Sequence, residues 1–294
     1  MPGPRRLVPV LAIVLALCCA VAPVSSAASP APAGQDGRDE RLARVLEKAK
    51  AYCRRLERAA LDFICTERIE EITFKLPEFR VDETGQRLGF VDVELVPRRT
   101  RTNTLVYDYQ FVRKGDLKKE RRILIEENGR KRNEDDAELA AQSIRVENAL
   151  FGPIGLLGAE WQVRHDYRIV GEESPDGGTV LVVEAVPKPS LTQPHCFGRV
   201  WVREDDGSVV KIAWDQASVG NFAQVEAEAL RLGAEPVLTS VTEYGVDKNG
   251  LRFPSRDATE EAYRIGAGKP AVRSSTTIVY TDYKFFTVAT EIAF

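Results

Sequence analysis

The chain has 294 residues, of which 44% are hydrophobic, enough to bury the core of one large domain or two small ones. Its 41 lysines and arginines are nearly matched by 44 aspartates and glutamates, and the formal net charge is −3. Proteins that bind nucleic acid usually carry a strongly basic surface, so this balance argues against a nucleic-acid partner.

The N-terminus has the order of a secretory signal. Two arginines precede an apolar run from residue 7 to 22, and Ser25 and Ala27 stand at positions −3 and −1 of a cut before Ala28. The run is shorter than the roughly 20 apolar residues of a membrane-spanning helix. We therefore expect residues 1–27 to be cleaved and the mature protein to be periplasmic or secreted.

A lipoprotein signal is the alternative to cleavage near Ala27. The segment from Leu15 to Cys18 has the outline of a lipobox, although Leu17 occupies a position where a small residue is usual. Lipid attached to Cys18 would tether the same domain to a membrane.

Residues 28–37 are rich in alanine, proline and glycine and predict a disordered spacer before a single domain at 38–294. From Arg38 onward, apolar residues recur at the spacing of one helical face. They are Leu42, Val45, Leu46, Ala49, Cys53, Leu56, Ala60 and Phe63. This pattern predicts a long amphipathic helix.

Cys53 and Cys65 are candidates for a disulfide. On one straight helix they would lie about 18 Å apart, which is too far for a bond. If the helix ends near Ala60 and a strand runs back along it, the two cysteines lie at comparable distances from the turn and can meet. An exported protein can hold such a bond, so we predict it, with Cys196 left as a small buried thiol.

After Cys65 the hydrophobic pattern changes to period two. Residues 105–112 predict a half-buried strand whose aromatic face carries Tyr107, Tyr109 and Phe111. Three further pairs of strands flank turn sequences, namely 160–172 with 179–187 around residues 175–178, 198–203 with 208–214 around 205–207, and 237–246 with 251–254 around Asn249-Gly250.

The remaining segments add short helices and final strands. Asn128-Gly129 predicts a tight turn, 135–142 and 223–232 predict helices, and 273–280 and 286–294 predict two closing strands. One leading helix is thus followed by about ten strands in hairpin order. Few helical crossovers separate them, so an α+β domain built on a large, curved antiparallel sheet is expected.

Sequence motifs for catalysis are absent. The chain has two histidines, His165 and His195, and it contains no HExxH, CxxC or GxSxG pattern. His195 precedes Cys196 directly, and neighbouring residues on a strand point to opposite faces, which does not suit a nucleophile and its base. We expect no enzymatic activity, no cofactor and no metal site.

The three tryptophans lie in predicted strands on both faces of the sheet. Trp201 lies opposite Val200, whereas Trp214 shares its face with Ile212. One interpretation is that helices cover one face and the other is partly wet. The functional interpretation is a concave apolar face that holds a ligand, since burial gives about 25 cal/mol per Å². Its candidate residues are Tyr107, Tyr109, Phe111, Trp161, Trp201 and Trp214.

The hairpin from Gly198 to Ile212 resembles the "G-x-V-W-V … G … V-x-K-I" hairpin of LolA/LolB-type periplasmic proteins, a fold shared by the regulator RseB. Residues 243–254 and 279–283 are similar to the later hairpins of outer-membrane lipoprotein-sorting-like proteins. The chain departs from these families at 79–97 and 218–232, which look like insertions, and none of their functional residues is carried over.

The resemblance implies a half-open antiparallel barrel, with an N-terminal helix and short helices over its mouth. It implies a non-enzymatic protein that binds a lipid, an acyl chain or a lipidated protein. The alternative that it allows is a regulatory or scaffolding module that binds another envelope protein, as RseB does.

Overall fold

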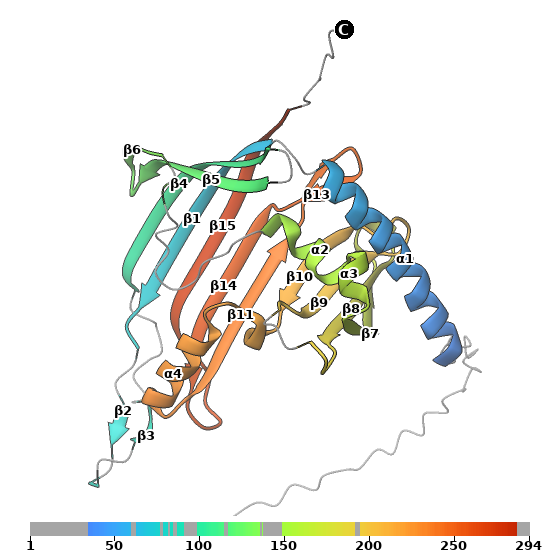
Figure 1. Cartoon of the computed structure of the whole chain (residues 1–294). Coiled ribbons are helices and arrows are strands. Elements are labelled where there is room, and N and C mark those ends of the chain that lie inside the picture. The colour runs from blue at the N-terminus through green and yellow to red at the C-terminus, as the bar shows by residue number, and fades with distance from the viewer. Residues whose placement is uncertain are drawn as a thin grey trace, which may run out of the picture.

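The computed structural model describes residues 35–59, 63–76, 79–81, 83–84, 87–90, 99–114, 117–135, 137, 149–191 and 195–286. Their centre is an 11-stranded antiparallel sheet with its helices on one face (Figure 1). The predicted α+β architecture with a large antiparallel sheet is confirmed.

Along the sheet the strands are β6 (Arg130–Glu134), β5 (Leu117–Glu127), β4 (Arg99–Lys114), β1 (Phe63–Phe74), β15 (Ala271–Phe285), β14 (Arg256–Arg264), β11 (Glu235–Glu243), β10 (Val209–Trp214), β9 (Gly198–Arg203), β8 (Val180–Pro187) and β7 (His165–Glu173). Two small hairpins pair β2 (Phe79–Val81) with β3 (Arg87–Phe90), and β12 (Val246–Lys248) with β13 (Leu251–Phe253). The helices are α1 (Gln35–Ala59), α2 (Gly152–Leu157), α3 (Ala159–Gln162) and α4 (Phe222–Leu232), with 3₁₀ turns η1 (Ala149–Phe151), η2 (Pro175–Gly177) and η3 (Gln216–Ser218).

The predicted turns form the hairpins, because their residues adopt positive φ angles. Asn249 and Gly250 have φ of 56° and 70° between β12 and β13, and Asn128 and Gly129 have 50° and 78° between β5 and β6. Paired left-handed residues give the twist that two-residue hairpins need.

Strand β1 lies in the middle of the sheet, between β4 and the last strand, β15. Ile69 is opposite Leu105 on one side and Ile278 on the other. The centre of the sheet therefore joins segments that are far apart in sequence.

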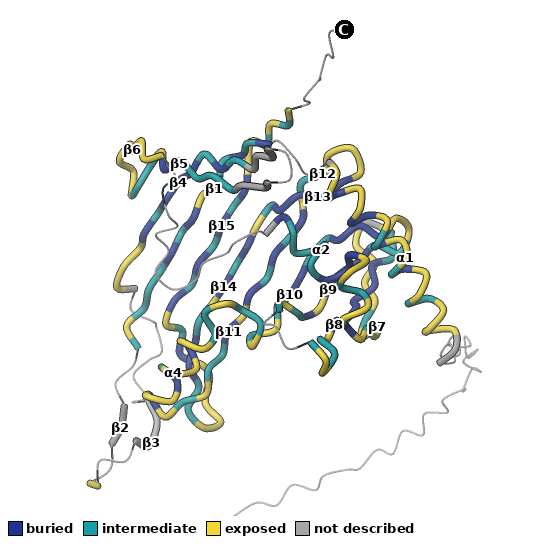
Figure 2. The backbone as a smooth tube through the Cα atoms, viewed as in Figure 1, coloured by how far each residue is buried: buried dark blue, intermediate teal, exposed yellow. Residues whose placement is uncertain are grey.

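Helix α1 begins at Gln35 rather than near Arg38, and its apolar side faces the core as predicted. Ala49, Tyr52 and Leu56 are fully buried, and Val45 is nearly so. Figure 2 shows both buried and exposed positions along this helix. At its N-terminal half, Arg41 bonds both Glu204 and Glu172, at 2.6 and 2.7 Å. The helix contacts α2, β7, β9 and β13.

The predicted disulfide between Cys53 and Cys65 is wrong, because both thiols are free and buried. Cys53 donates instead to the carbonyl oxygen of Pro153 at 3.4 Å. The strand that follows α1 does not run back along the helix: α1 crosses the β7–β9 end of the sheet, whereas β1 lies among β4 and β15 (Figure 1). Cys196, predicted to be buried, is exposed.

Other predictions near the helices have mixed outcomes. Trp161 lies in α3 instead of a strand, and the strand that follows starts only at His165. The helix predicted at 223–232 is confirmed as α4, which ends at Gly233 with φ of 63°. The helix predicted at 135–142 lies mostly outside the described residues, as does most of the strand predicted at 286–294. Among the described helices, none is long and apolar enough to cross a membrane.

Candidate functional site

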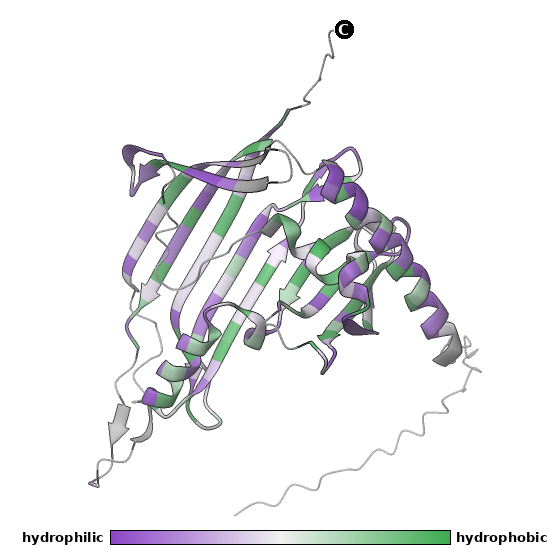
Figure 3. Cartoon of the chain, viewed as in Figure 1, coloured by the Kyte–Doolittle hydropathy of each residue, from purple (hydrophilic) through white to green (hydrophobic). Residues whose placement is uncertain are grey.

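We call the helix-covered side of the sheet the inner face and the opposite side the outer face. Over β7 to β10 the inner face is apolar and lies beneath α1, α2 and α3 (Figure 3). Its residues Leu181, Val183, Val200 and Ile212 are fully buried. This part of the face is filled by the protein's own side chains.

Toward the middle of the sheet, the inner face changes from apolar to polar side chains. Across β11, β14, β15 and β1 runs a row of polar side chains, each 6% exposed or less. This polar band consists of Ser240, Thr242, Asp257, Thr259, Ser274, Thr276 and Glu67. Hydrogen bonds join Thr242, Asp257, Thr259 and Ser240 within the band, whereas the buried hydroxyl of Thr276 has no partner among the described residues.

Asp257 is the centre of that network. The Thr242 hydroxyl donates to its carboxylate at 2.6 Å and Thr259 donates at 3.4 Å, while Trp214 Nε1 donates to Thr242 at 2.9 Å. Burial raises the pKa of Asp257 to about 6, although the two hydroxyls act in the opposite direction. The predicted ligand residue Trp214 is therefore linked to a carboxyl that burial pushes toward its neutral form.

The raised pKa predicts that Asp257→Asn stabilises the protein at neutral pH. Stability tied to a raised carboxyl pKa is complete below the ordinary value of 3.8 and is lost as pH rises through about 6. Above pH 6 we expect the variant to have a higher urea midpoint and a free energy of unfolding greater by at most about 3 kcal/mol. Near pH 3.5 the two proteins should be equally stable. Urea denaturation at pH 3.5, 6 and 8 measures this, with the exposed Asp39→Asn as control; equal stability at pH 8 would contradict it.

Tyr107 and Tyr109 lie on the inner face of β4 and are buried, as their strand pattern predicts. The Tyr109 hydroxyl donates to Glu120 at 2.6 Å, and its ring lies 4.6 Å from the Arg122 guanidinium carbon. Arg122 also forms a two-point ion pair with the fully buried Glu67, at 2.7 and 3.2 Å. This end of the inner face is held by a charged cluster.

The six candidate ligand residues do not gather at one place. Tyr107 and Tyr109 lie on β4, Trp214 lies on β10, and Trp161 lies on α3. Trp201 is on the outer face, since Val200 and Val202 on the same strand point inward. For Phe111, the side chain lies outside the described part of the chain.

Helices α2 and α3 form a small cover, residues 152–162, over part of the apolar inner face. Gly152 lies so close to the face that a Cβ there would be 2.5 Å from Tyr244 Oη and 3.0 Å from Trp214. A side chain at this position cannot fit without displacing the cover or the face. The cover therefore packs directly on the strands.

The cover is also held through its backbone carbonyls. His195 Nε2 is 2.7 Å from Gly155 O, His165 Nδ1 is 2.9 Å from Trp161 O, and Tyr167 donates to Leu156 O. The ring of His195 also stacks on Trp161, with centroids 3.7 Å apart. Both histidines thus fasten the cover, a role that their sequence positions did not reveal.

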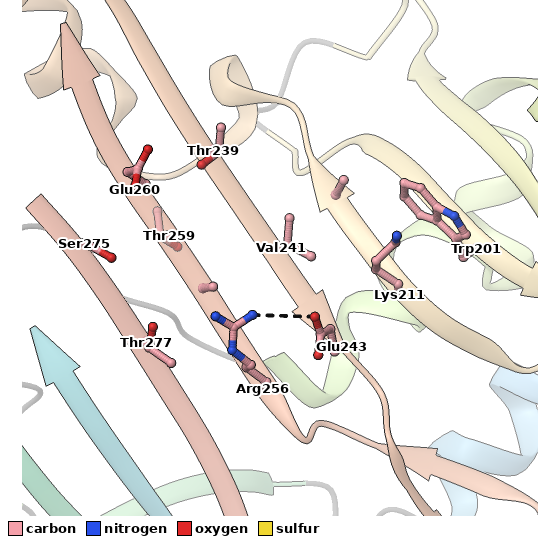
Figure 4. A pocket seen from close by; sticks show the side chains of 12 residues that line it. Trp201, Lys211, Thr239, Val241, Glu243, Arg256, Thr259, Glu260, Ser275 and Thr277 are labelled. Carbon is pink, nitrogen blue, oxygen red and sulfur yellow. Dashed lines mark ion pairs between the residues drawn. The ribbon is translucent and has the colours of Figure 1, made fainter. Parts of the chain in front are cut away.

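The described residues contain a second site, a shallow groove of about 470 Å³ on the outer face (Figure 4). Its floor consists of Ala213, Val241 and Ala258, which lie side by side on β10, β11 and β14. Polar side chains and Trp201 stand on both sides of this row, with Trp201, Lys211, Glu243 and Arg256 on one side and Thr239, Glu260 and Ser275 on the other. The sequence analysis missed this groove, because its floor takes one small residue from each of three strands.

The side chains of the groove are partly paired. Lys211 Nζ lies 3.8 Å from the Trp201 ring centroid, and Trp201 Nε1 donates to Glu173 at 2.8 Å. Arg256 and Glu243 form an ion pair at 3.6 Å. Nowhere in the described parts of the chain do three or more potential metal ligands cluster.

No family model matches the chain, and a search of curated proteins finds no match. The solved structures that are similar include a LolA superfamily protein from Nitrosomonas europaea, with 12% identity over 83% of this chain and 93% of that one, and a TM-score of 0.30. An outer membrane lipoprotein-sorting protein domain from Vibrio parahaemolyticus has 12% identity over 84% and 94%, with a TM-score of 0.38. The MucA/MucB complex of Pseudomonas aeruginosa has 13% identity over 86% and 100%, with a TM-score of 0.19.

Two of these structures carry the names of the lipoprotein-sorting proteins that the sequence resembles. What the chain binds has to be inferred from its own side chains.

Proposed function

We propose that this chain is a non-enzymatic binding protein of the cell envelope, which shelters an acyl chain of a lipid or lipidated protein between the cover and the apolar inner face. The observation that supports it is a short, weakly built cover lying directly on an apolar surface. The secretory signal predicted at residues 1–27 is consistent with a location outside the inner membrane.

The cover has little stability of its own. Helix α2 has six residues and α3 has four, and neither has a side-chain N-cap. Helices this short do not persist in water without packing. Their place depends on tertiary contacts: the buried side chains of Leu156 and Leu157, the carbonyl contacts with His165, Tyr167 and His195, and two hydrogen bonds with helix α1, from Cys53 to Pro153 O and from Gln162 to Leu46 O. A ligand that replaces these contacts can lift the cover without unfolding the sheet.

The surface beneath the cover suits an acyl chain. Ile212 and Tyr244 are fully buried there, beside the partly buried Trp214. Lifting the cover exposes apolar area that water disfavours, and an acyl chain restores the burial at about 25 cal/mol per Å². The ligand thus takes the position of the cover instead of entering an empty cavity.

Lipid extraction and native mass spectrometry of the exported protein test this proposal. We expect one lipid or one added fatty-acid probe per chain, and the intact mass also reports whether the chain starts at Ala28 or carries lipid on Cys18. A protein that takes up no fatty-acid or lipopeptide probe contradicts the proposal. An envelope pull-down that yields one stoichiometric protein and no lipid would favour a regulatory or scaffolding role instead.

Loosening the cover is expected to speed exchange of the lipid. His195→Ala removes the contact to Gly155 O and the stacking on Trp161, so a fluorescent fatty acid should enter several-fold faster than in the native protein. Trp201→Ala on the outer face is the matched control and should leave the rate unchanged. Equal rates in all three proteins would show that the cover does not gate the site.

A further inference from the structure

The outer groove lies on the side of the sheet opposite the cover, and the proposed lipid site does not use it. Its lining is arranged in three parallel rows that cross the strands. Lys211, Glu243 and Arg256 are directly opposite one another in the first row, and the small floor residues form the second. In the third row, Glu260 lies between Thr239 and Ser275.

The two outer rows carry opposite unmatched charges. In the first row Arg256 is paired with Glu243, and the Lys211 ammonium contacts the Trp201 ring without a carboxylate partner among the described residues. In the third row the exposed Glu260 has no cation partner within the same described set. One end of the groove is therefore cationic and the other anionic (Figure 4).

The spacing of these charges fits a short extended chain. Lys211 and Glu260 are two strands apart, about 10 Å, and four residues apart along the strands, about 13 Å. The diagonal is about 16 Å, which is about the full reach from a lysine ammonium to a carboxylate two residues further along an extended peptide. The hydroxyl of Thr239 on β11 flanks this path, and those of Ser275 and Thr277 on β15 lie just beyond Glu260; all three can bond amide groups.

The apolar floor of the groove favours ligands with small side chains. Ala213, Val241 and Ala258 form a shallow apolar strip rather than a deep pocket, so it offers no place for a large anchoring side chain. The floor strands are hydrogen-bonded to neighbours on both sides, so a peptide cannot join the sheet as an extra strand. A ligand has to lie across the strands and bind through its charges, its amides and small methyl groups.

We propose that the outer groove binds the stem peptide of the bacterial cell wall, with a carboxylate at Lys211 and the ammonium of its diamino residue at Glu260. Such a peptide has alanine methyl groups, free carboxylates and an ammonium within five residues, which are the features that the groove matches. The inference relies on the envelope location in the proposed function, but not on lipid binding.

Titration of the ¹⁵N-labelled mature protein with Ala-γ-D-Glu-Lys-D-Ala-D-Ala tests the inference. We expect saturable shifts of amides on β10, β11, β14 and β15, and binding about tenfold weaker in Lys211→Met and in Glu260→Gln, since each loses one ion pair in a partly exposed site. Arg231→Gln, an exposed residue on α4, is the control variant and should bind like the native protein. No shifts at millimolar peptide, or shifts confined to the inner face, would overturn the inference.

Modified peptides identify which charge binds where. Acetylation of the lysine side chain should weaken binding to the native protein about tenfold and leave binding to Glu260→Gln unchanged. Equal losses in both proteins would refute the assigned orientation. If the all-L peptide Ala-Glu-Lys-Ala-Ala binds as tightly, the occupant is a protein segment and the cell-wall assignment is wrong. Lys211→Met should take up fatty acid as well as the native protein does. Failure of the peptide proposal can therefore be distinguished from failure of the lipid proposal.

Discussion

Replacing Gly207 with alanine is expected to destabilise the protein by about 3–5 kcal/mol. Gly207 lies in the turn between β9 and β10 with φ of 73°, and a Cβ there would be 2.4 Å from the backbone of Lys48 and Ala49. Two backbones meet at this point, so neither side chain flexibility nor a rotamer change can relieve the clash. Helix α1 has to move away from the sheet, which also strains the ion pairs of Arg41.

A matched glycine separates the clash from backbone strain. Gly250 has φ of 70° in the β12–β13 turn, and nothing lies within 4 Å of its missing Cβ. Gly250→Ala should therefore show only the left-handed strain, about 1 kcal/mol. Urea denaturation of both variants measures the difference in the free energy of unfolding. If Gly207→Ala is destabilised no more than Gly250→Ala, helix α1 does not pack against this turn.

Replacing Arg122 with methionine should be the second severe change, with a loss of about 3–5 kcal/mol at pH 7.5. It leaves the carboxylate of Glu67, which is fully buried, without its cation. Burial already raises the pKa of Glu67, and Arg122 is the main group that opposes this. Without Arg122, folding requires either a buried unpaired charge or a bound proton.

The loss of stability in Arg122→Met should depend on pH. With the folded pKa of Glu67 raised further, stability is complete below its ordinary value of 4.5 and is lost as pH rises through the folded pKa. The defect of Arg122→Met should therefore shrink from pH 7.5 to pH 5. The double variant Arg122→Met with Glu67→Gln should recover most of the loss, whereas Arg231→Met at an exposed pair should change little. A defect that is the same at both pH values would refute this explanation.

Local sequence signals predicted the elements of the fold well. Asn128-Gly129, Asn249-Gly250 and the turn ending at Gly207 adopt the positive φ angles that their residue types favour, and the strands beside them follow. Period two alone also predicts that Val200 and Trp201 lie on opposite faces, but not which face is covered, and Trp201, a candidate for the apolar ligand face, lies on the outer face. These signals act between close neighbours in sequence, so one sequence is enough to show them.

Predictions that depended on distant segments were less successful. Whether Cys65 approaches Cys53 depends on where β1 lies in the sheet, and that is decided by pairing with β4 and β15. Likewise, Lys211 and Glu260 belong to one groove only because β11 lies between β10 and β14. The carbonyls that bind His165 and His195 come from helices whose positions no local pattern specified.

The central position of β1 also has a consequence for how the chain folds. Its partner β15 begins at Ala271, about 200 residues after β1, so the middle of the sheet cannot close until both strands have been made. Pairing of segments so distant in sequence is slow, because a long loop must be closed before any contact is gained. For a protein predicted to be exported, we expect this delay to be useful, since a chain that lacks the strand completing its core stays unfolded while it is threaded across a membrane.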